Sequence, residues 1–185
     1  MSDEVVKGLD SLLRKLSAMG DDAAPIMQKG VNKGLKRIQS SAKLLCPSNS
    51  GELRNSIKTQ SRVQGGKVVG EVYTNKEHAA YVEFGTGPVG EETLQEVPEG
   101  LNITHSPTGW WIHVGEGEND ISPEIVEKYH FFTITGEDGE KYAFSNGSPA
   151  QPFMYPALEA NRDNVLHDVA GVIHKEIIKK VRNSD

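Results

Sequence analysis

Residues 42–63 read AKLLCPSNSGELRNSIKTQSRV, and the character of the chain changes within this stretch. Upstream of it, apolar residues recur at helical spacing from Ile26 to Leu45. Pro47 cannot continue a helix, and residues 46–51 have the composition of a turn throughout. The stretch therefore predicts that a helix ends here and that a sheet begins.

Two helices are expected before this turn. The apolar stripe of the first consists of Leu9, Leu12, Leu13 and Leu16. Asp21 or Asp22 can cap the second helix, and Pro25 is tolerated in its first turn. The apolar positions of the second helix are Ile26, Met27, Val31, Leu35, Ile38, Ala42 and Leu45.

The strands are expected as hairpins. Residues 56–63 and 67–74 are rich in β-branched side chains and flank the turn Gln64-Gly65-Gly66. Further strands are expected at residues 110–114, 131–135 and 141–144, the last two joined by a second hairpin turn.

Two glycine- and proline-rich corners bound the later part of the chain. The apolar run from His78 to Phe84 is closed by Gly85-Thr86-Gly87-Pro88, where the chain must turn. After residues 151–156, which read QPFMYP, a last helix is expected with Pro156 in its first turn. Its apolar face consists of Leu158, Val165, Val169, Val172 and Ile173.

Charge is distributed unevenly. The chain of 185 residues has 20 Lys and Arg against 26 Asp and Glu, a net charge of −6, which argues against a generally basic nucleic-acid binder. Residues 88–148 alone contain 12 acidic and 2 basic side chains, so we expect an ordered, acidic, β-rich insertion there. The second helix carries a stripe of basic residues, Lys29, Lys33, Lys36, Arg37 and Lys43. The stripe is either a solvated helix face or a contact for nucleic acid or an acidic partner.

No constellation for catalysis is present in the sequence. Its six histidines are scattered without a metal-ligand spacing, so neither a metal nor a cofactor is expected. Cys46 is the only cysteine, which excludes an intrachain disulfide, and we expect it to be buried as a small hydrophobe. Gly85-Thr86-Gly87 lacks the Lys-Ser/Thr pair of a phosphate-binding loop and is read as a structural turn. Neither a signal peptide nor an apolar membrane span is expected, which predicts a soluble intracellular protein. Because no catalytic constellation is present in the sequence, the protein is not expected to be an enzyme.

Three blocks of the sequence resemble a known family. Residues 42–57 are similar to the A-K-x-x-x-P-x-x-T-G-x-L-R-x-S-I signature of the head-to-tail joining, or tail-completion, proteins of long-tailed bacteriophages, with Ser50 in place of Thr. Residues 78–87 resemble the family block Y-A-x-Y-V-E-F-G-T-G, and residues 151–158 resemble its closing block x-P-F-L-x-P-A-L. The segment 88–148 is longer than the short link of many members.

The resemblance implies a virion structural protein, made in the host cytoplasm, that joins the head connector or stopper protein to the tail terminator or tail tube protein. It implies a homo-oligomeric ring through which DNA passes without specific binding. The residues expected to form fold corners or an interface are Gly51, Leu53, Ser56, Tyr81, Glu83, Phe84, Gly85, Thr86, Pro152, Phe153 and Pro156. Among them, Glu83 is the side chain expected to contact a neighbouring subunit.

The expected architecture is α+β and a single domain over residues 1–185. Two N-terminal helices precede an antiparallel sheet, which is interrupted by the acidic β-rich insertion 88–148. A C-terminal helix is expected to pack on the sheet. The alternative function is a nucleic-acid-binding protein that uses the basic second helix.

Overall fold

The computed structural model describes residues 20, 23–47 and 51–182. The first predicted helix, with Leu9 to Leu16, lies outside these residues. The chain divides into two compact units. The first unit contains the described residues up to Lys76 and those from Phe153 onward, and the second extends from Glu77 to Pro152. Each unit is described by itself below.

The described residues of the first unit form three helices and one β-hairpin. Its elements are α2 (Ala23–Leu45), α3 (Glu52–Ser56), β1 (Lys58–Gln64), β2 (Lys67–Tyr73) and α7 (Tyr155–Arg182). The hairpin confirms the sequence prediction, because β1 and β2 pair antiparallel from Lys58↔Tyr73 to Gln64↔Lys67. Its turn is made by Gly65 and Gly66, which both have positive φ.

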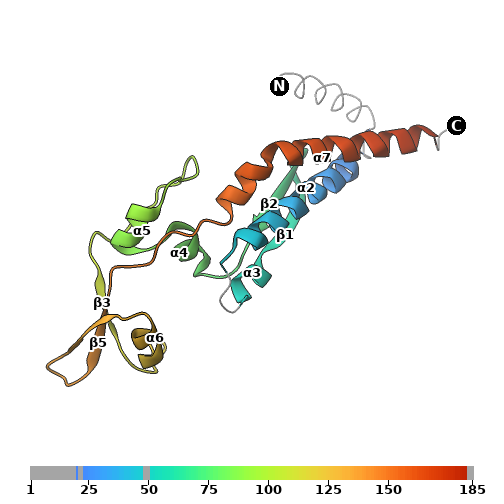
Figure 1. Cartoon of the computed structure of the whole chain (residues 1–185). Coiled ribbons are helices and arrows are strands. Elements are labelled where there is room, and N and C mark those ends of the chain that lie inside the picture. Colours follow the sequence, from blue (N-terminus) through green and yellow to red (C-terminus); the bar gives the residue numbers. More distant parts are fainter. Residues whose placement is uncertain (1–19, 21–22, 48–50, 183–185) are drawn as a thin grey trace. The chain divides into compact units, whose positions relative to one another are not determined.

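Helix α2 is the central layer of the first unit. Figure 1 shows it lying along the hairpin on one side and along α7 on the other. Glycines allow both close approaches: a Cβ on Gly34 would lie 2.6 Å from Cγ1 of Val165 in α7. A Cβ on Gly70 in β2 would lie 2.6 Å from Cγ1 of Val31 in α2. The C-terminal helix therefore packs mainly on α2 and not on the sheet as predicted, because α2 already occupies the face of the hairpin.

The buried positions of the two long helices follow the predicted apolar spacing with two exceptions. Ile26 of α2 and Ile173 of α7 form a buried cluster at the seam between them, with Val169 packed against it. Leu45 and Leu158 are exposed, although the spacing placed them on the apolar faces. Both lie in a terminal turn of their helix.

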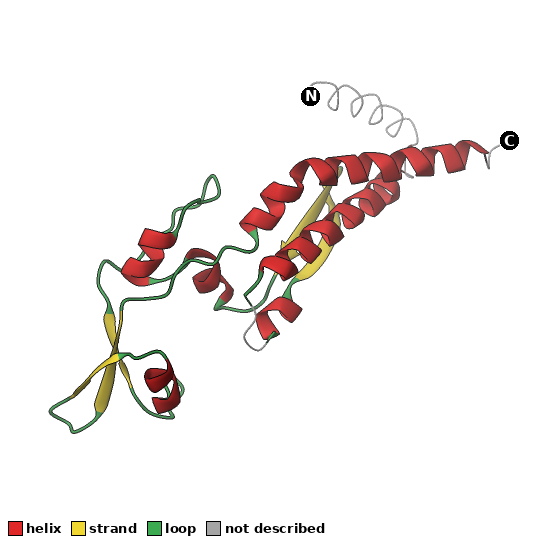
Figure 2. Cartoon of the chain, in the orientation of Figure 1, coloured by secondary structure: helices red, strands yellow, loops and turns green. Residues whose placement is uncertain are grey.

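The second unit contains the acidic segment. Its elements are α4 (Ala79–Phe84), α5 (Gly87–Thr93), β3 (Trp110–His113), α6 (Pro123–Lys128), β4 (Phe132–Thr135) and β5 (Lys141–Ser145). The three strands form an antiparallel sheet in the order β3-β5-β4, which confirms the predicted strands and their hairpin. Figure 2 shows these strands with α6 beside them.

The fold class is α+β, as predicted, but the arrangement of the strands differs from the prediction. The strands do not belong to one sheet interrupted by an insertion. The hairpin β1-β2 is complete before the acidic segment begins, and β3, β5 and β4 form a sheet of their own. None of the described helices is long and apolar enough to cross a membrane.

Candidate functional site

The second unit is organised around the corner that follows α4. This helix ends at Gly85, whose φ of 73° and ψ of −179° lie in a region that is essentially restricted to glycine. A Cβ at this position would lie 2.6 Å from Cα of Gly90 and 2.7 Å from the backbone nitrogen of Ala150. The corner is therefore a point where three stretches of backbone touch.

Thr86 and Ser148 form a backbone bridge at this corner. The amide of Thr86 donates to the carbonyl oxygen of Ser148 over 2.9 Å, and the amide of Ser148 donates back over 3.1 Å. Their hydroxyl oxygens lie 3.0 Å apart, and the amide of Ser148 also donates to Oγ1 of Thr86. The two ends of the predicted insertion 88–148 are thus tied together. We call residues 85–90 and 145–151 the neck.

Further backbone contacts extend the neck. The amide of Val89 donates to the carbonyl oxygen of Asn146 over 3.2 Å, and the amide of Gln151 donates to that of Val82 over 2.8 Å. The amide of Ala150 donates to Oγ1 of Thr93 over 2.8 Å. Because these bonds are mostly between backbone groups, the neck depends on the course of the chain more than on particular side chains.

Sequence reasoning missed one essential residue of the neck. Gly147 has a φ of 95°, and a Cβ there would collide with the carbonyl group of Thr86. The Asn-Gly dipeptide at 146–147 is a turn signal that could have marked this position. The residue that Gly147 contacts could not be found from the local pattern, because Thr86 lies 61 residues away in the sequence.

A cavity of about 570 Å³ lies next to the neck within the second unit. Its lining includes the rings of Tyr81, Phe84 and Trp110. His105 also lines it, and Nε2 of this histidine is 2.9 Å from the carbonyl oxygen of Phe84. The cavity is mainly apolar and lacks a cluster of reactive groups, so it offers a contact surface for side chains of a ligand or partner.

The residues expected at corners or at an interface are distributed over both units. Those in the second unit are Tyr81, Glu83, Phe84, Gly85, Thr86 and Pro152. Those in the first unit are Gly51, Leu53, Ser56, Phe153 and Pro156. Glu83 is only 6% exposed, so its carboxylate lies inside the fold instead of at the surface where it was expected. Phe153 is fully buried and so belongs to the core of the first unit.

Gly51, Leu53 and Ser56 form the corner that precedes the hairpin. Gly51 has a φ of 76° and its carbonyl oxygen accepts from the amide of Asn55, at the start of the short helix α3. Ser56 is buried, and its hydroxyl donates to the carbonyl oxygen of Leu53 over 2.7 Å. The hydroxyl oxygen of Ser56 is also 2.6 Å from that of Thr74, which ties the helix to the end of β2.

Three of the five basic residues predicted as a stripe on α2 pair with α7. Lys33 and Arg37 contact the carboxylate of Asp168 at 2.8 and 2.7 Å, and Lys29 lies 3.2 Å from Glu176. The side chain of Asp168 is 9% exposed, and its hydrogen bonds to Arg37 and Lys33 lower its pKa to about 2. The stripe therefore contacts α7 while it stays exposed to solvent: the side chains of Lys29, Lys33 and Arg37 are 59%, 55% and 44% exposed.

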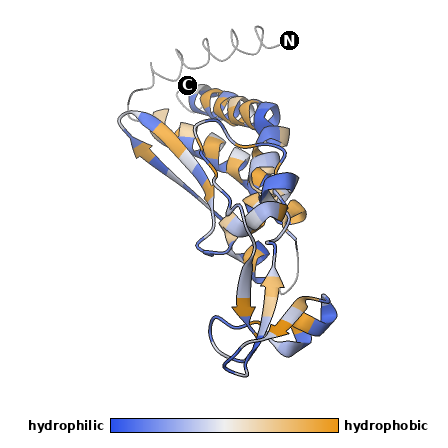
Figure 3. Cartoon of the chain, turned by 90° about the vertical axis from the view of Figure 1, so that its left-hand side faces the viewer, coloured by the Kyte–Doolittle hydropathy of each residue, from blue (hydrophilic) through white to orange (hydrophobic). Residues whose placement is uncertain are grey.

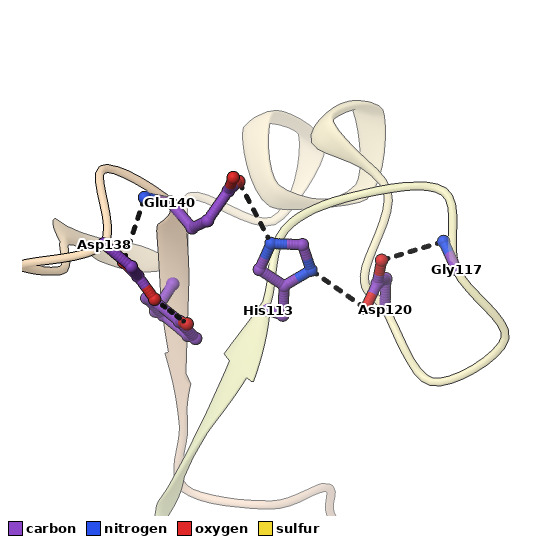
Figure 4. A network of polar contacts seen from close by, with 6 residues as sticks. His113, Gly117, Asp120, Asp138 and Glu140 are labelled. Atoms are coloured by element: carbon purple, nitrogen blue, oxygen red, sulfur yellow. Dashed lines mark hydrogen bonds and ion pairs between the residues drawn. The ribbon is translucent and has the colours of Figure 1, made fainter.

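A polar network lies at the end of the three-stranded sheet. Nδ1 of His113 is 3.0 Å from Asp120 and Nε2 is 3.3 Å from Glu140, as Figure 4 shows. The hydrogen bond to Asp120 is the main reason why the pKa of His113 is raised, and Glu140 adds to it. The pKa of Asp120 is lowered, first by the amide of Gly117 and then by His113. Within the described residues, no group of three or more His, Cys, Asp or Glu side chains is arranged to hold a metal ion.

The comparison with known protein families adds a likeness to these structural features. The chain is similar to structural components of bacteriophage tails. Residues 10–85 match the family described as Bacteriophage HK97-gp10, putative tail-component. No curated protein matches the chain, and no solved structure does.

The family match confirms the resemblance seen in the sequence. The match covers less than half of the chain and ends at Gly85. It contains the first block, residues 42–57, and most of the second block, residues 78–87. The match therefore stops where the neck begins, and residues 88–148 lie outside it. It supports a structural role as a component of a phage tail, in the virion.

Proposed function

We propose that this protein joins the DNA-filled head of a long-tailed bacteriophage to its tail. The observation that carries the proposal is the match of residues 10–85 to a family of phage tail components. The proposal takes its finer part, the junction, from the resemblance of the three sequence blocks to head-to-tail joining proteins. The partners are then a head connector or stopper protein on one side and a tail terminator or tail tube protein on the other.

The proposed working form is a homo-oligomeric ring around the DNA channel. A ring lets the duplex pass while each subunit contacts both neighbours and the proteins above and below. The net charge of −6 suits such a passage, because a lumen with few exposed Lys and Arg side chains does not bind phosphate strongly. The fold offers rigid corners and helix seams for such contacts, and no residue is assigned a catalytic role.

The alternative, a nucleic-acid-binding protein that uses the basic second helix, has less support. Lys29, Lys33 and Arg37 form ion pairs with α7, so binding phosphate through them means breaking these pairs. A salt-dependent affinity for DNA with a steep slope is the result that would favour this alternative.

The test of the joining role is electron microscopy of particles produced without this protein. We expect filled heads and finished tails that remain separate, and joined particles when the purified chain is added back. Normal attachment without the protein, or a block in DNA packaging instead, contradicts the proposal.

A further inference from the structure

The three-stranded sheet of the second unit carries a row of aromatic side chains on one face. Trp111, Phe144 and Phe132 are register partners on β3, β5 and β4. The ring of Trp111 lies 4.9 Å from that of Phe144 and 6.0 Å from that of Phe132 between centroids. Ile134, two residues along β4, lies on the same side, because side chains alternate along a strand. We call Trp111, Phe132, Ile134 and Phe144 the aromatic face.

The two faces of this sheet differ in burial. On the opposite face, Ala143 is fully buried, and Thr133 lines the same cavity as the buried Val126 of α6. On the aromatic face, Phe132 is 67% exposed, Trp111 44% and Ile134 42%. Figure 3 shows the hydrophobic colouring on the strands of this unit. A contiguous group of large apolar side chains that are exposed to solvent is typical of an interaction surface.

Acidic side chains crowd one end of this sheet. They come from two turns, residues 115–120 after β3 and residues 136–140 between β4 and β5, and they are Glu116, Glu118, Asp120, Glu137, Asp138 and Glu140. His113 lies between Asp120 and Glu140 and so connects the two turns (Figure 4). Basic residues are few, since residues 88–148 contain only 2 of them against 12 acidic ones.

This charge restricts what can cover the aromatic face. DNA is repelled by the acidic turns, because the duplex carries a dense row of phosphates. A second copy of the same face brings the same acidic turns close to one another, and juxtaposed like charges disfavour that contact. A protein surface with Lys and Arg around protruding apolar side chains matches both the apolar row and the negative rim.

We propose that the aromatic face is a docking surface for another protein of the virion whose own contact surface is basic and carries protruding apolar side chains. The proposal rests on the proposed function only in taking this partner from the phage head or tail. It assigns a role to the segment 88–148, which lies outside the family match. The apolar row supplies the buried centre of the contact, and the acidic turns supply its charged rim.

The test uses filled heads and finished tails purified separately from particles lacking this protein. The purified chain is added to each and bound protein is measured by co-sedimentation. The variant is Phe132→Ser with Ile134→Ser, and the matched control is Leu101→Ser, which removes an exposed leucine elsewhere in the same unit. We expect the parent to bind one of the two particles, the double variant to lose at least about tenfold in affinity, and the control to bind like the parent. Raising the salt concentration should weaken binding of the parent.

Several results would overturn the docking proposal. Equal binding by the double variant would do so, and so would parent protein that binds neither heads nor tails. If binding disappears when exposed DNA is digested, DNA is the occupant instead. If the parent is an oligomer by sedimentation velocity and the double variant is not, a second copy covers the face. Far-UV circular dichroism of the variant must match the parent, so that lost binding does not reflect unfolding.

The two proposals fail separately. Normal attachment in particles without this protein contradicts the joining role, whatever the double variant binds. Failure of the double variant to lose affinity contradicts the docking surface, even where joining depends on the protein. The number of joined particles formed when parent or variant is added to heads and tails gives both readouts in one experiment.

Discussion

Gly85 is subject to two separate constraints. Its backbone conformation is one that side chains with a Cβ adopt only with strain, at φ 73° and ψ −179°. The space around it is also filled, because backbone atoms of Gly90, Ser148 and Ala150 surround the position where a Cβ would lie. Gly65 in the hairpin turn shares the positive φ but has no atom within 4 Å of that position. Gly65 therefore serves as a reference for a glycine with positive φ and no crowding.

We expect Gly85→Ala to lower the stability of the protein more than Gly65→Ala. Both substitutions introduce a Cβ at positive φ, which costs about 1–2 kcal/mol. Only Gly85→Ala also forces backbone segments apart, and we expect at least about 2 kcal/mol more for it. Thermal unfolding followed by circular dichroism compares the two variants with the parent. Equal midpoints for the two variants would show that the neck is not tightly packed.

His113 is expected to titrate in a way that reports its two carboxylate neighbours. Because its pKa is raised above 6.5 in the folded protein, its protonated form contributes stability that is complete below pH 6.5 and is lost as the pH rises through the folded value. Asp120 has a lowered pKa, so its contribution is present above pH 3.8 and is lost as the pH falls through the depressed value. The network is therefore most favourable between these two limits.

An NMR titration of the His113 ring tests this assignment. We expect its midpoint above 6.5 in the parent and a lower midpoint in Asp120→Asn, which removes the carboxylate charge. The signals of His174, exposed on α7, serve as the reference that this substitution should not move. An unchanged midpoint of His113 would mean that the contact with Asp120 does not persist in solution.

The carboxylate of Asp168 connects the two long helices α2 and α7. Asp168 accepts from Arg37 and pairs with Lys33, both on α2, and lies in the same helix as the buried Ile173. Its pKa of about 2 means that the carboxylate stays ionised down to strongly acidic pH, and that the stability from its pairing is lost as the pH falls from about 3.8 toward 2. The carboxylate thus contributes stability over the neutral range.

We expect Asp168→Asn to destabilise the first unit by about 1–2 kcal/mol, since it removes charge-assisted hydrogen bonds from a nearly buried group. Glu176→Gln is the matched control, because it removes a longer pair to the exposed Lys29 and should cost a few tenths of a kcal/mol at most, about the value of a surface pair. Urea unfolding of both variants gives the comparison. A similar loss in both would place Asp168 among ordinary surface charges.

Long elements could be predicted from the sequence, whereas short ones could not. The apolar spacing from Ile26 to Ala42 and the buried Ile173 located α2 and α7, because a helix of many turns repeats its pattern. The hairpin turn at Gly65 and Gly66 located β1 and β2. Helices of five to seven residues, such as α3 and α5, contain too few turns to show a period.

Only the local features of the candidate site could be predicted from the sequence. The glycine at 85 marked a corner, because local composition carries that signal. Three other features depend on contacts between segments far apart in sequence. They are the pairing of Thr86 with Ser148, the pairing of Lys33 with Asp168 and the packing of α7 on α2. The burial of Glu83 has the same origin, since a charged residue in a single sequence gives no sign of its surroundings.

At the scale of the whole molecule, the single domain expected over residues 1–185 remains a prediction. Both tryptophans, Trp110 and Trp111, lie in the second unit, so their fluorescence reports its unfolding. Most of the helical residues that the structure describes belong to α2 and α7 in the first unit, so the helical signal in circular dichroism reports on that unit. One domain predicts a common midpoint for the two probes in thermal unfolding. Two separate midpoints would show that the two units are independent domains.

The bridge between Thr86 and Ser148 also bears on how such genes change over time. Because the two ends of the intervening segment meet, replacing everything between them leaves the flanking chain with the same gap to span. A longer or shorter segment is then tolerated at this place, because the flanking chain keeps its course. The neck is therefore the natural place at which this protein can gain or lose the segment 88–148 as a whole.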